Sequence, residues 1–175
     1  GIPNYYTSYS EMLSEVDAVY VASPNYVHEE QSIAAMESGR HVLCEKIMAP
    51  HPAAAERMIE ESKKRGVVLL EAMRPDFDLL ISTLRKQLND AGEIKDAYFE
   101  FRQYSRRYDK FKEGIIMNAF DPSMKNSALA DIGIYPLHLC ISLFGEPISV
   151  TGTVEFLHNG FMAVGVSVLH YDGFD

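Results

Sequence analysis

Cysteines and basic side chains are scarce in this sequence, and each shortage excludes a class of protein. The 175 residues include two cysteines, Cys44 and Cys140, far apart in apolar surroundings. Buried thiols in a reducing cytoplasm are therefore expected, rather than a disulfide. The 16 basic and 25 acidic side chains give a formal charge of −9, which argues against a nucleic-acid or anionic-membrane partner.

Long apolar runs, targeting signals and metal-ligand clusters are also missing. No apolar run approaches the length that spans a bilayer, and residues 1–4 have neither the basic nor the apolar region of a signal peptide. No cluster of His, Cys, Asp or Glu has metal-ligand spacing, so no metal is expected. The sequence favours a cytoplasmic globular protein of one or two domains.

Strand and helix patterns alternate from residue 10 to about residue 72. Short apolar strands are predicted at 18–22, 41–44 and 67–70, and helices at 11–16, 27–38 and 52–66. Short, non-alternating strands joined by crossover helices are typical of a parallel sheet that is covered on both faces.

The pattern changes near Arg74-Pro75, which marks the predicted domain boundary between 1–74 and 75–175. Beyond it the sequence predicts a helix over 77–92, an alternating, antiparallel-type strand over 94–104, an irregular stretch over 105–127, a helix over 129–144, and a hairpin of strands at 148–157 and 161–170.

Two segments carry polar, titratable side chains within this apolar framework. Glu45 and Lys46 directly follow a buried strand, and open α/β sheets bind ligands at the carboxyl ends of their strands. Asp131 and Tyr135 are spaced for one helical face, with His138 one turn further. The alternative is a helix-capping Asp and a packed Tyr. Because Lys, Tyr and His all transfer protons in active sites, the two segments together indicate an enzyme.

These residues resemble the Gfo/Idh/MocA family of NAD(P)-dependent oxidoreductases. The family's Ser/Thr-Pro-Asn-x-x-His turn is matched by residues 23–28, its Glu-Lys-Pro motif by 45–47 with Ile47 at the proline position, and its Asp-x-Gly-x-Tyr/His motif by 131–135. Residues 71–74 resemble the segment that enters the family's second domain. The four motifs occur in family order over nearly the whole chain, which makes the resemblance specific.

The resemblance implies an α/β fold in two parts. Residues 1–74 would form the C-terminal half of a Rossmann doubly wound parallel sheet. Residues 75–175 would form an α+β domain for substrate binding and oligomerisation, with an open, mainly antiparallel sheet. The family's Gly-rich pyrophosphate loop has no counterpart here, so the sequence is expected to be the middle of a longer protein.

The resemblance also implies residue roles in hydride transfer between NAD or NADP and a sugar, polyol or diol. Lys46 would bind the substrate hydroxyl and exchange its proton. Tyr135 would be the acid/base group beside Asp131, and His138 is the rival candidate. The residues expected to contact the cofactor are Ser23, Pro24, Asn25, His28, Glu45, Lys46 and Arg74. A homo-oligomer built through the open sheet face is expected as well.

Ile47 leaves an alternative open, a non-catalytic regulator of the same fold that senses a dinucleotide or a sugar. The family's proline often follows a cis peptide bond, which costs about 3 kcal/mol before other residues, so the backbone at Lys46 is expected to differ from the family's. The intact pair of Lys46 and Tyr135 favours the enzyme. A third alternative, an interaction domain, follows from the lack of a pyrophosphate loop.

Overall fold

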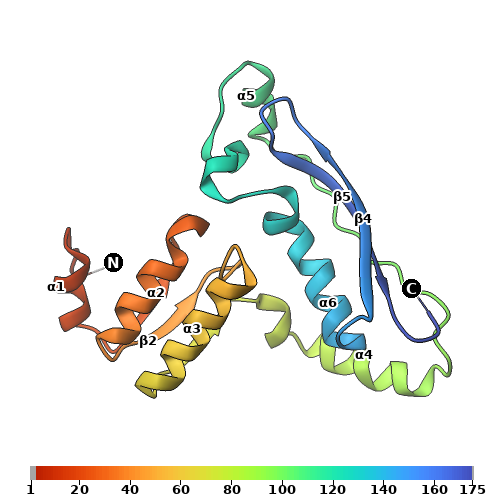
Figure 1. Ribbon diagram of the computed structural model, residues 1–175, viewed down its shortest axis with the longest axis horizontal. Coiled ribbons are helices and arrows are strands. Elements are labelled where there is room, and N and C mark those ends of the chain that lie inside the picture. The colour runs from red at the N-terminus through yellow and green to blue at the C-terminus, as the bar shows by residue number, and fades with distance from the viewer. Residues whose placement is uncertain (1–2, 175) are drawn as a thin grey trace. The chain divides into compact units, whose positions relative to one another are not determined.

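A computed structural model describes residues 3–174 of the chain (Figure 1). Gly1 and Ile2, which belong to the N-terminal stretch without signal-peptide features, lie outside the described residues. The chain forms two compact units, Gly1–Ala72 and Met73–Asp175. This division falls close to the predicted boundary after residue 74, and the roles assigned to the two parts stay predictions.

The first unit is built on a three-stranded parallel sheet with the strand order β1-β2-β3. Its strands are β1 (Ala18–Val21), β2 (His41–Cys44) and β3 (Leu69–Glu71). Val19 pairs with Val42, which pairs with Leu69, so these side chains lie on the same face of the sheet. Strand β2 has the predicted bounds, and the parallel arrangement is confirmed.

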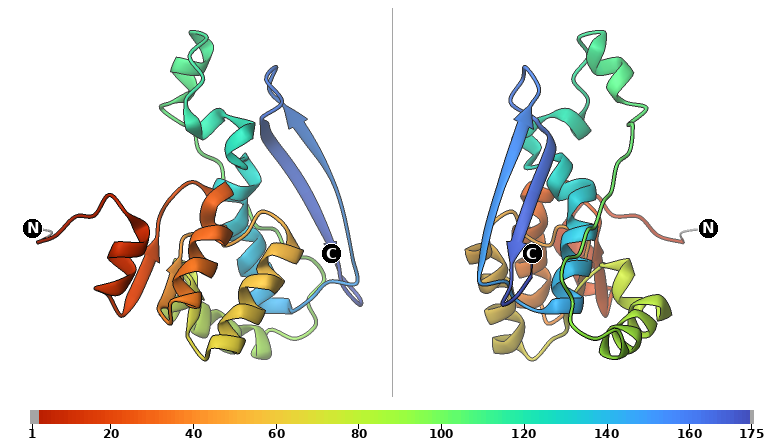
Figure 2. Two further views of the ribbon diagram at one scale, coloured as in Figure 1. Left: turned by 60° about the vertical axis from the view of Figure 1, so that its left-hand side comes forward. Right: turned by 90° about the vertical axis from the view of Figure 1, so that its right-hand side faces the viewer.

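Both crossover helices of the first unit lie side by side over one face of this sheet (Figure 2). They are α2 (His28–Glu37) and α3 (Pro52–Arg65), and the short elements α1 (Tyr9–Ser14) and η1 (Asn25–Val27) complete the unit. Met36, Met58 and Cys44 are fully buried in the core that results. Gly66 ends α3 in the left-handed conformation, with φ of 66°, which glycine adopts without steric cost.

The opposite face of the sheet is exposed, so the prediction of cover on both faces is wrong for the described residues. Tyr20, Leu43 and Leu70 lie in register across the three strands and are 56%, 37% and 50% exposed. Both crossovers step in the same direction across the sheet. Because such connections are right-handed, their helices fall on the same face.

The second unit combines helices with an antiparallel hairpin. Its longer elements are α4 (Leu79–Asp90), α6 (Ile134–Phe144), β4 (Ser149–Phe156) and β5 (Met162–His170). Its short elements are η2 (Arg74–Phe77), α5 (Tyr108–Lys112), η3 (Asn118–Phe120), η4 (Pro122–Met124) and η5 (Leu129–Gly133). The hairpin runs alongside α6 in both views (Figures 1 and 2), and β5 contacts η5.

Residues 94–104 do not form the predicted strand. The segment has no regular secondary structure, because a strand needs a hydrogen-bonded neighbour and the only antiparallel pair among the described residues is β4 with β5. The predicted alternation nevertheless orients its side chains. Phe99 packs edge-on against Phe144, with ring centroids 6.2 Å apart, and Phe101 stacks on Tyr135 at 5.9 Å.

The helical run 122–144 contradicts the prediction that no apolar run has spanning length. By length and composition alone this run is long and apolar enough to cross a membrane. It joins η4 to η5 and α6 through Lys125, which lies in the left-handed conformation. The run has packing partners in its own unit: Phe99 and Phe101 contact it as described, and the Cys140 sulfur lies 3.7 Å from the Tyr171 hydroxyl. We therefore treat it as a packed helix of the second unit.

The irregular stretch 105–127 is anchored by aromatic side chains to the turn of the hairpin. Phe111, Phe120 and Phe161 form a small buried cluster, in which the rings of Phe120 and Phe161 lie 5.0 Å apart. The Asn159 side-chain amide donates to the Phe120 carbonyl over 2.7 Å. The stretch therefore folds back on the turn 157–161 instead of extending into solvent.

Candidate functional site

The carboxyl ends of the three parallel strands meet at one edge of the sheet, and the predicted cofactor residues of the first unit lie there. Strand β1 leads to Ser23, β2 leads to Glu45, and β3 ends at Glu71. The sheet hydrogen bonds continue to this point, because the Glu45 N–H donates to the Val21 carbonyl over 2.8 Å. Open α/β sheets bind ligands at this kind of edge.

Glu45 and Lys46 are half-buried at the centre of this edge. The Glu45 carboxylate accepts a hydrogen bond from the Tyr20 hydroxyl and another from the Lys46 backbone N–H, at 3.2 Å. The hydrogen bond to this carboxylate raises the pKa of Tyr20, so Tyr20 remains a neutral donor. The Lys46–Ile47 peptide bond is cis, and the prediction that the backbone differs here from that of the family is therefore wrong.

His28 is the first residue of α2, one position after the predicted start of this helix, and its ring is fully buried. Its Nδ1 lies 2.8 Å from the Ile47 carbonyl oxygen and its Nε2 lies 2.8 Å from the Ser23 carbonyl oxygen. The ring thus connects the turn after β1 with the loop after β2. Cofactor contact by the residues of these two segments stays a prediction.

Two further side chains hold the loop after β2. The Met48 backbone N–H donates to the Glu71 carboxylate over 2.7 Å. Beneath the loop, the buried Cys44 thiol lies 3.9 Å from the Met48 carbonyl. Burial raises the pKa of Cys44 to about 11, so this thiol is protonated at neutral pH and is no nucleophile.

The second unit presents Asp131 and Tyr135 on consecutive turns of one helical run. Asp131 is exposed in η5, a wide turn of π-helical geometry, and Tyr135 is half-buried in the first turn of α6. Pro136 follows and has no N–H to donate to the preceding turn. The regular helix begins at Ile134, later than the predicted start at residue 129. Wide turns of this kind frequently occur at functional sites.

His138, the rival acid/base candidate, is held by Asp76 of η2. Its Nε2 lies 2.6 Å from the Asp76 carboxylate and 3.2 Å from the Ser142 hydroxyl. Since both contacts use one ring nitrogen, they do not form a hydrolase-type relay, which needs the two nitrogens separately. Arg74, the predicted cofactor residue of this unit, is exposed in the same turn as Asp76. The pairing of Lys46 with Tyr135 across the two units stays a prediction.

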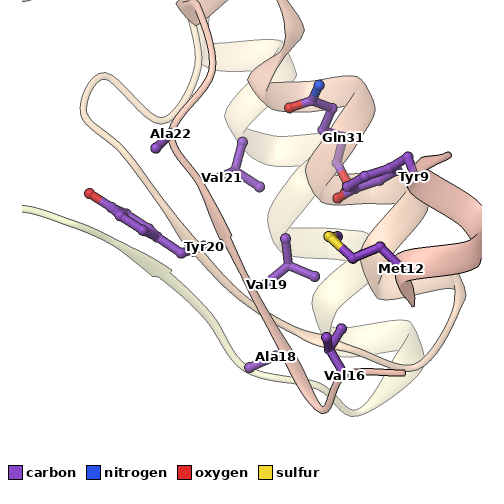
Figure 3. Close-up of a pocket in the computed structure, with 9 residues that line it drawn as sticks. All are labelled: Tyr9, Met12, Val16, Ala18, Val19, Tyr20, Val21, Ala22 and Gln31. Carbon is purple, nitrogen blue, oxygen red and sulfur yellow. The ribbon is translucent and has the colours of Figure 1, made fainter. Parts of the chain in front are cut away.

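A pocket of about 300 Å³ lies along the outer edge of β1 (Figure 3). Its lining comes from α1, β1 and α2 and carries no charged side chain: Tyr9, Met12, Val16, Ala18, Val19, Tyr20, Val21, Ala22 and Gln31. Within residues 3–174, β1 pairs only with β2. An apolar groove beside an unpaired strand edge fits a further strand better than a charged cofactor.

Three contributors to these sites were not predicted from the sequence: Tyr20, Glu71 and Asp76. The contact of Tyr20 with Glu45 could have been predicted from strand register, because Tyr20 pairs with Leu43 and residues 43 and 45 share a face of a strand. Glu71 had the weaker signal of ending a strand at the same edge. In the described part of the chain, no group of three or more His, Cys, Asp or Glu side chains could hold a metal ion.

Comparison with known proteins identifies relatives of the chain. Residues 1–73 match an oxidoreductase family with an NAD-binding Rossmann fold. The chain is 42% identical to scyllo-inositol 2-dehydrogenase (NADP(+)) IolU of Bacillus subtilis (strain 168) over 159 residues, which cover 91% of this chain and 48% of that protein. It is 30% identical to trans-1,2-dihydrobenzene-1,2-diol dehydrogenase of Xenopus tropicalis over 180 residues, 99% of this chain and 52% of that protein. The chain thus spans about half the length of the curated relatives it matches.

A solved structure supports the same fold. The oxidoreductase yvaA of Bacillus subtilis superposes with a TM-score of 0.78 and 20% identity, covering 95% of this chain and 47% of that one. At this identity the likeness concerns the fold alone. It confirms the predicted α/β architecture with a Rossmann-type parallel sheet.

Proposed function

We propose, because this chain belongs to the Gfo/Idh/MocA family of oxidoreductases, that the protein transfers hydride between a nicotinamide dinucleotide and a polyol, sugar or diol. The substrate class is supported by the polyol and diol dehydrogenases to which the chain is similar. Since the chain spans about half their length, the activity is that of the whole protein. The NADP(+) in the name of the inositol dehydrogenase makes NADP the first cofactor to test.

The observation that carries the proposal is the half-buried Glu45-Lys46 pair at the carboxyl edge of the parallel sheet. Tyr20 orients the Glu45 carboxylate, and Glu71 holds the amide of Met48, so the loop that bears Lys46 is held on both sides. The hydroxyl, carboxylate and ammonium groups of this edge fit the polar ribose and carboxamide of a nicotinamide nucleoside. Glu45 and the turn 23–25 would hold that part of the cofactor.

The bound dinucleotide supplies the hydride acceptor or donor, and the side chains of this chain handle the proton. The Lys46 ammonium binds the substrate hydroxyl oxygen and stabilises the negative charge that develops as its proton leaves. Lys46 and Tyr135 share the transfer of that proton, and Asp131 binds a neighbouring substrate hydroxyl. The named dehydrogenase relatives favour this enzyme over the non-catalytic sensor, so a single function is proposed.

The proposal extends to the setting of the enzyme, a cytoplasmic homo-oligomer without a nucleic-acid or membrane partner. Both cysteines are free, which supports a reducing compartment, and the charge of −9 disfavours anionic partners. On the hairpin, Val164 and Val166 pair with Glu155 and Thr153 and are exposed. Exposed valines on a sheet face support a subunit contact there.

Replacing Lys46 by methionine in the intact protein tests the mechanism. General acid–base groups contribute about 10²–10⁴-fold to rate, so kcat on scyllo-inositol and related polyols should fall by at least about 10²-fold. NADPH affinity should change much less. Lys63→Met, an exposed position in the last turn of α3, is the matched control. Undiminished turnover in the Lys46 variant would refute the mechanism.

A further inference from the structure

His28 anchors the loop that carries Lys46 on the side of α2. The ring nitrogens lie 2.8 Å from two main-chain carbonyl oxygens, one at Ile47, directly after Lys46, and one at Ser23, in the turn after β1. The ring itself is fully buried. It therefore acts on the surroundings of Lys46 through the main chain.

The contact with Ile47 matters because a carbonyl oxygen only accepts hydrogen bonds. If the Ile47 carbonyl lost its donor, the free-energy cost of removing it from water would no longer be offset. The loop would therefore rearrange to find another donor. The remaining anchors of the loop act on other groups. Glu71 accepts from the Met48 N–H, and Glu45 accepts from the Lys46 N–H, and neither can serve the Ile47 carbonyl.

We propose that His28 is a positioning residue for Lys46, whose Nδ1–H donates to the Ile47 carbonyl and fixes the direction in which the lysine leaves the loop. The Ser23 carbonyl oxygen lies on the other side of the ring, 2.8 Å from Nε2. The inference rests on the proposed function, in which Lys46 is the proton-transfer residue. Because its ring is fully buried, His28 in this assignment acts through the main chain, in place of the cofactor contact predicted for it.

Two amide substitutions separate the two contacts of the ring. An asparagine side chain places its NH₂ group near the position of Nδ1, so His28→Asn retains the donor to Ile47 and loses the contact with Ser23. A glutamine reaches the position of Nε2, so His28→Gln retains the contact with Ser23 and loses the donor to Ile47. Both variants lose the imidazole and are of similar polarity, so a general packing role would affect them alike.

In the intact protein, His28→Gln should lower kcat on the polyol substrate by about tenfold to hundredfold, the usual consequence of a small misplacement of a catalytic group. Substrate KM and NADPH affinity should change little, and His28→Asn should stay close to the wild type. His41→Asn is the matched control. His41 also bonds the main chain, accepting from the Val68 N–H over 3.0 Å, but it begins β2 at the opposite edge of the sheet. The substitution lies away from the loop that bears Lys46, so kcat should stay unchanged.

A second readout needs no turnover. Reductive ¹³C-methylation of lysines gives an NMR signal for Lys46, identified by its absence in Lys46→Met. This signal should shift in His28→Gln but not in His28→Asn or His41→Asn. Equal shifts and equal kcat losses in both His28 variants, or a change in melting temperature alone, would overturn the inference. Retained turnover in Lys46→Met would instead overturn the proposed function, so the two failures are distinguishable.

Discussion

The buried thiol of Cys44 should make the stability of the protein depend on alkaline pH. Burial at the end of β2 raises the pKa of Cys44 to about 11. The negative charges of Glu71 and Glu45 add to the increase, and the neighbouring Ser32 hydroxyl partly opposes it. Replacing Cys44 by alanine removes this titrating group and leaves a comparably small apolar side chain. The difference between wild type and variant therefore isolates the contribution of the thiol.

The sign follows from which state releases the proton first. An unfolded cysteine has a pKa near 8.5, so between about pH 8.5 and 11 the unfolded chain loses the thiol proton while the folded chain keeps it. The unfolded state then binds fewer protons, and the free energy of unfolding falls as pH rises. The complete shift corresponds to about 3 kcal/mol. Reduced for screening, about 1–2 kcal/mol should be lost between pH 8 and pH 10.

Urea unfolding at pH 8 and pH 10, followed by circular dichroism, measures this loss. Tyrosines and lysines remote from Cys44 titrate alike in wild type and in Cys44→Ala, so their contributions cancel; only Tyr9 and Tyr20 among the described tyrosines with a shifted pKa near this strand interact with Cys44. The variant should lose about 1–2 kcal/mol less than the wild type over this interval, whatever its stability at pH 8. Cys140→Ala leaves the Cys44 thiol in place and should follow the wild type. Parallel pH dependence in wild type and Cys44→Ala would refute the reasoning.

Three further predictions concern the site and the assembly. Tyr135→Phe should lower kcat by about 10²-fold or more, whereas His138→Ala should mainly lower the melting temperature. If only the His138 variant lost kcat severely, His138 would be the acid/base residue instead. The isolated 175-residue chain should bind NADH weakly or not at all, because one edge of β1 is unpaired within residues 3–174 and the sequence has no Gly-rich loop. Calorimetry showing tight, saturable binding would contradict this. Val166→Lys should weaken the proposed subunit contact, and light scattering that finds the intact wild type monomeric at all concentrations would rule that contact out.

The parts of the fold that could be predicted are those specified by local sequence. Residues 41–44 lie between the end of a helix and a charged pair, and this pattern predicted the bounds of β2. Pro52 and Gly66 predicted those of α3. Residues 94–104 show the limit of prediction from local sequence. Their alternation correctly separates the side chains that face α6 from those that face solvent, but pairing depends on a neighbouring strand, which no local pattern specifies.

The candidate site divides in the same way. Ser23 and Glu45 could be placed at one edge because the carboxyl ends of parallel strands meet there. The pairing of β1 with β2 also puts Tyr20 on the face of Glu45, so a register argument would have found that contact. The contact of Asp76 with His138 joins residues 62 positions apart, one in η2 and the other in α6. Neither hydrophobic periodicity nor a motif carries that information.

The contacts of the His28 ring explain the spacing of the Ser-Pro-Asn-x-x-His segment. Strand pairing of Val21 with Cys44 sets the distance between the turn after β1 and the loop after β2. A ring at the start of α2 reaches the Ser23 carbonyl, five residues back, and the Ile47 carbonyl, 19 residues on, only if the helix begins where it does. The motif that resembles a cofactor-binding turn therefore also holds the loop that bears Lys46. Cofactor contact requires an exposed turn and anchoring of the loop requires a buried ring, and together they account for a buried histidine beside that turn.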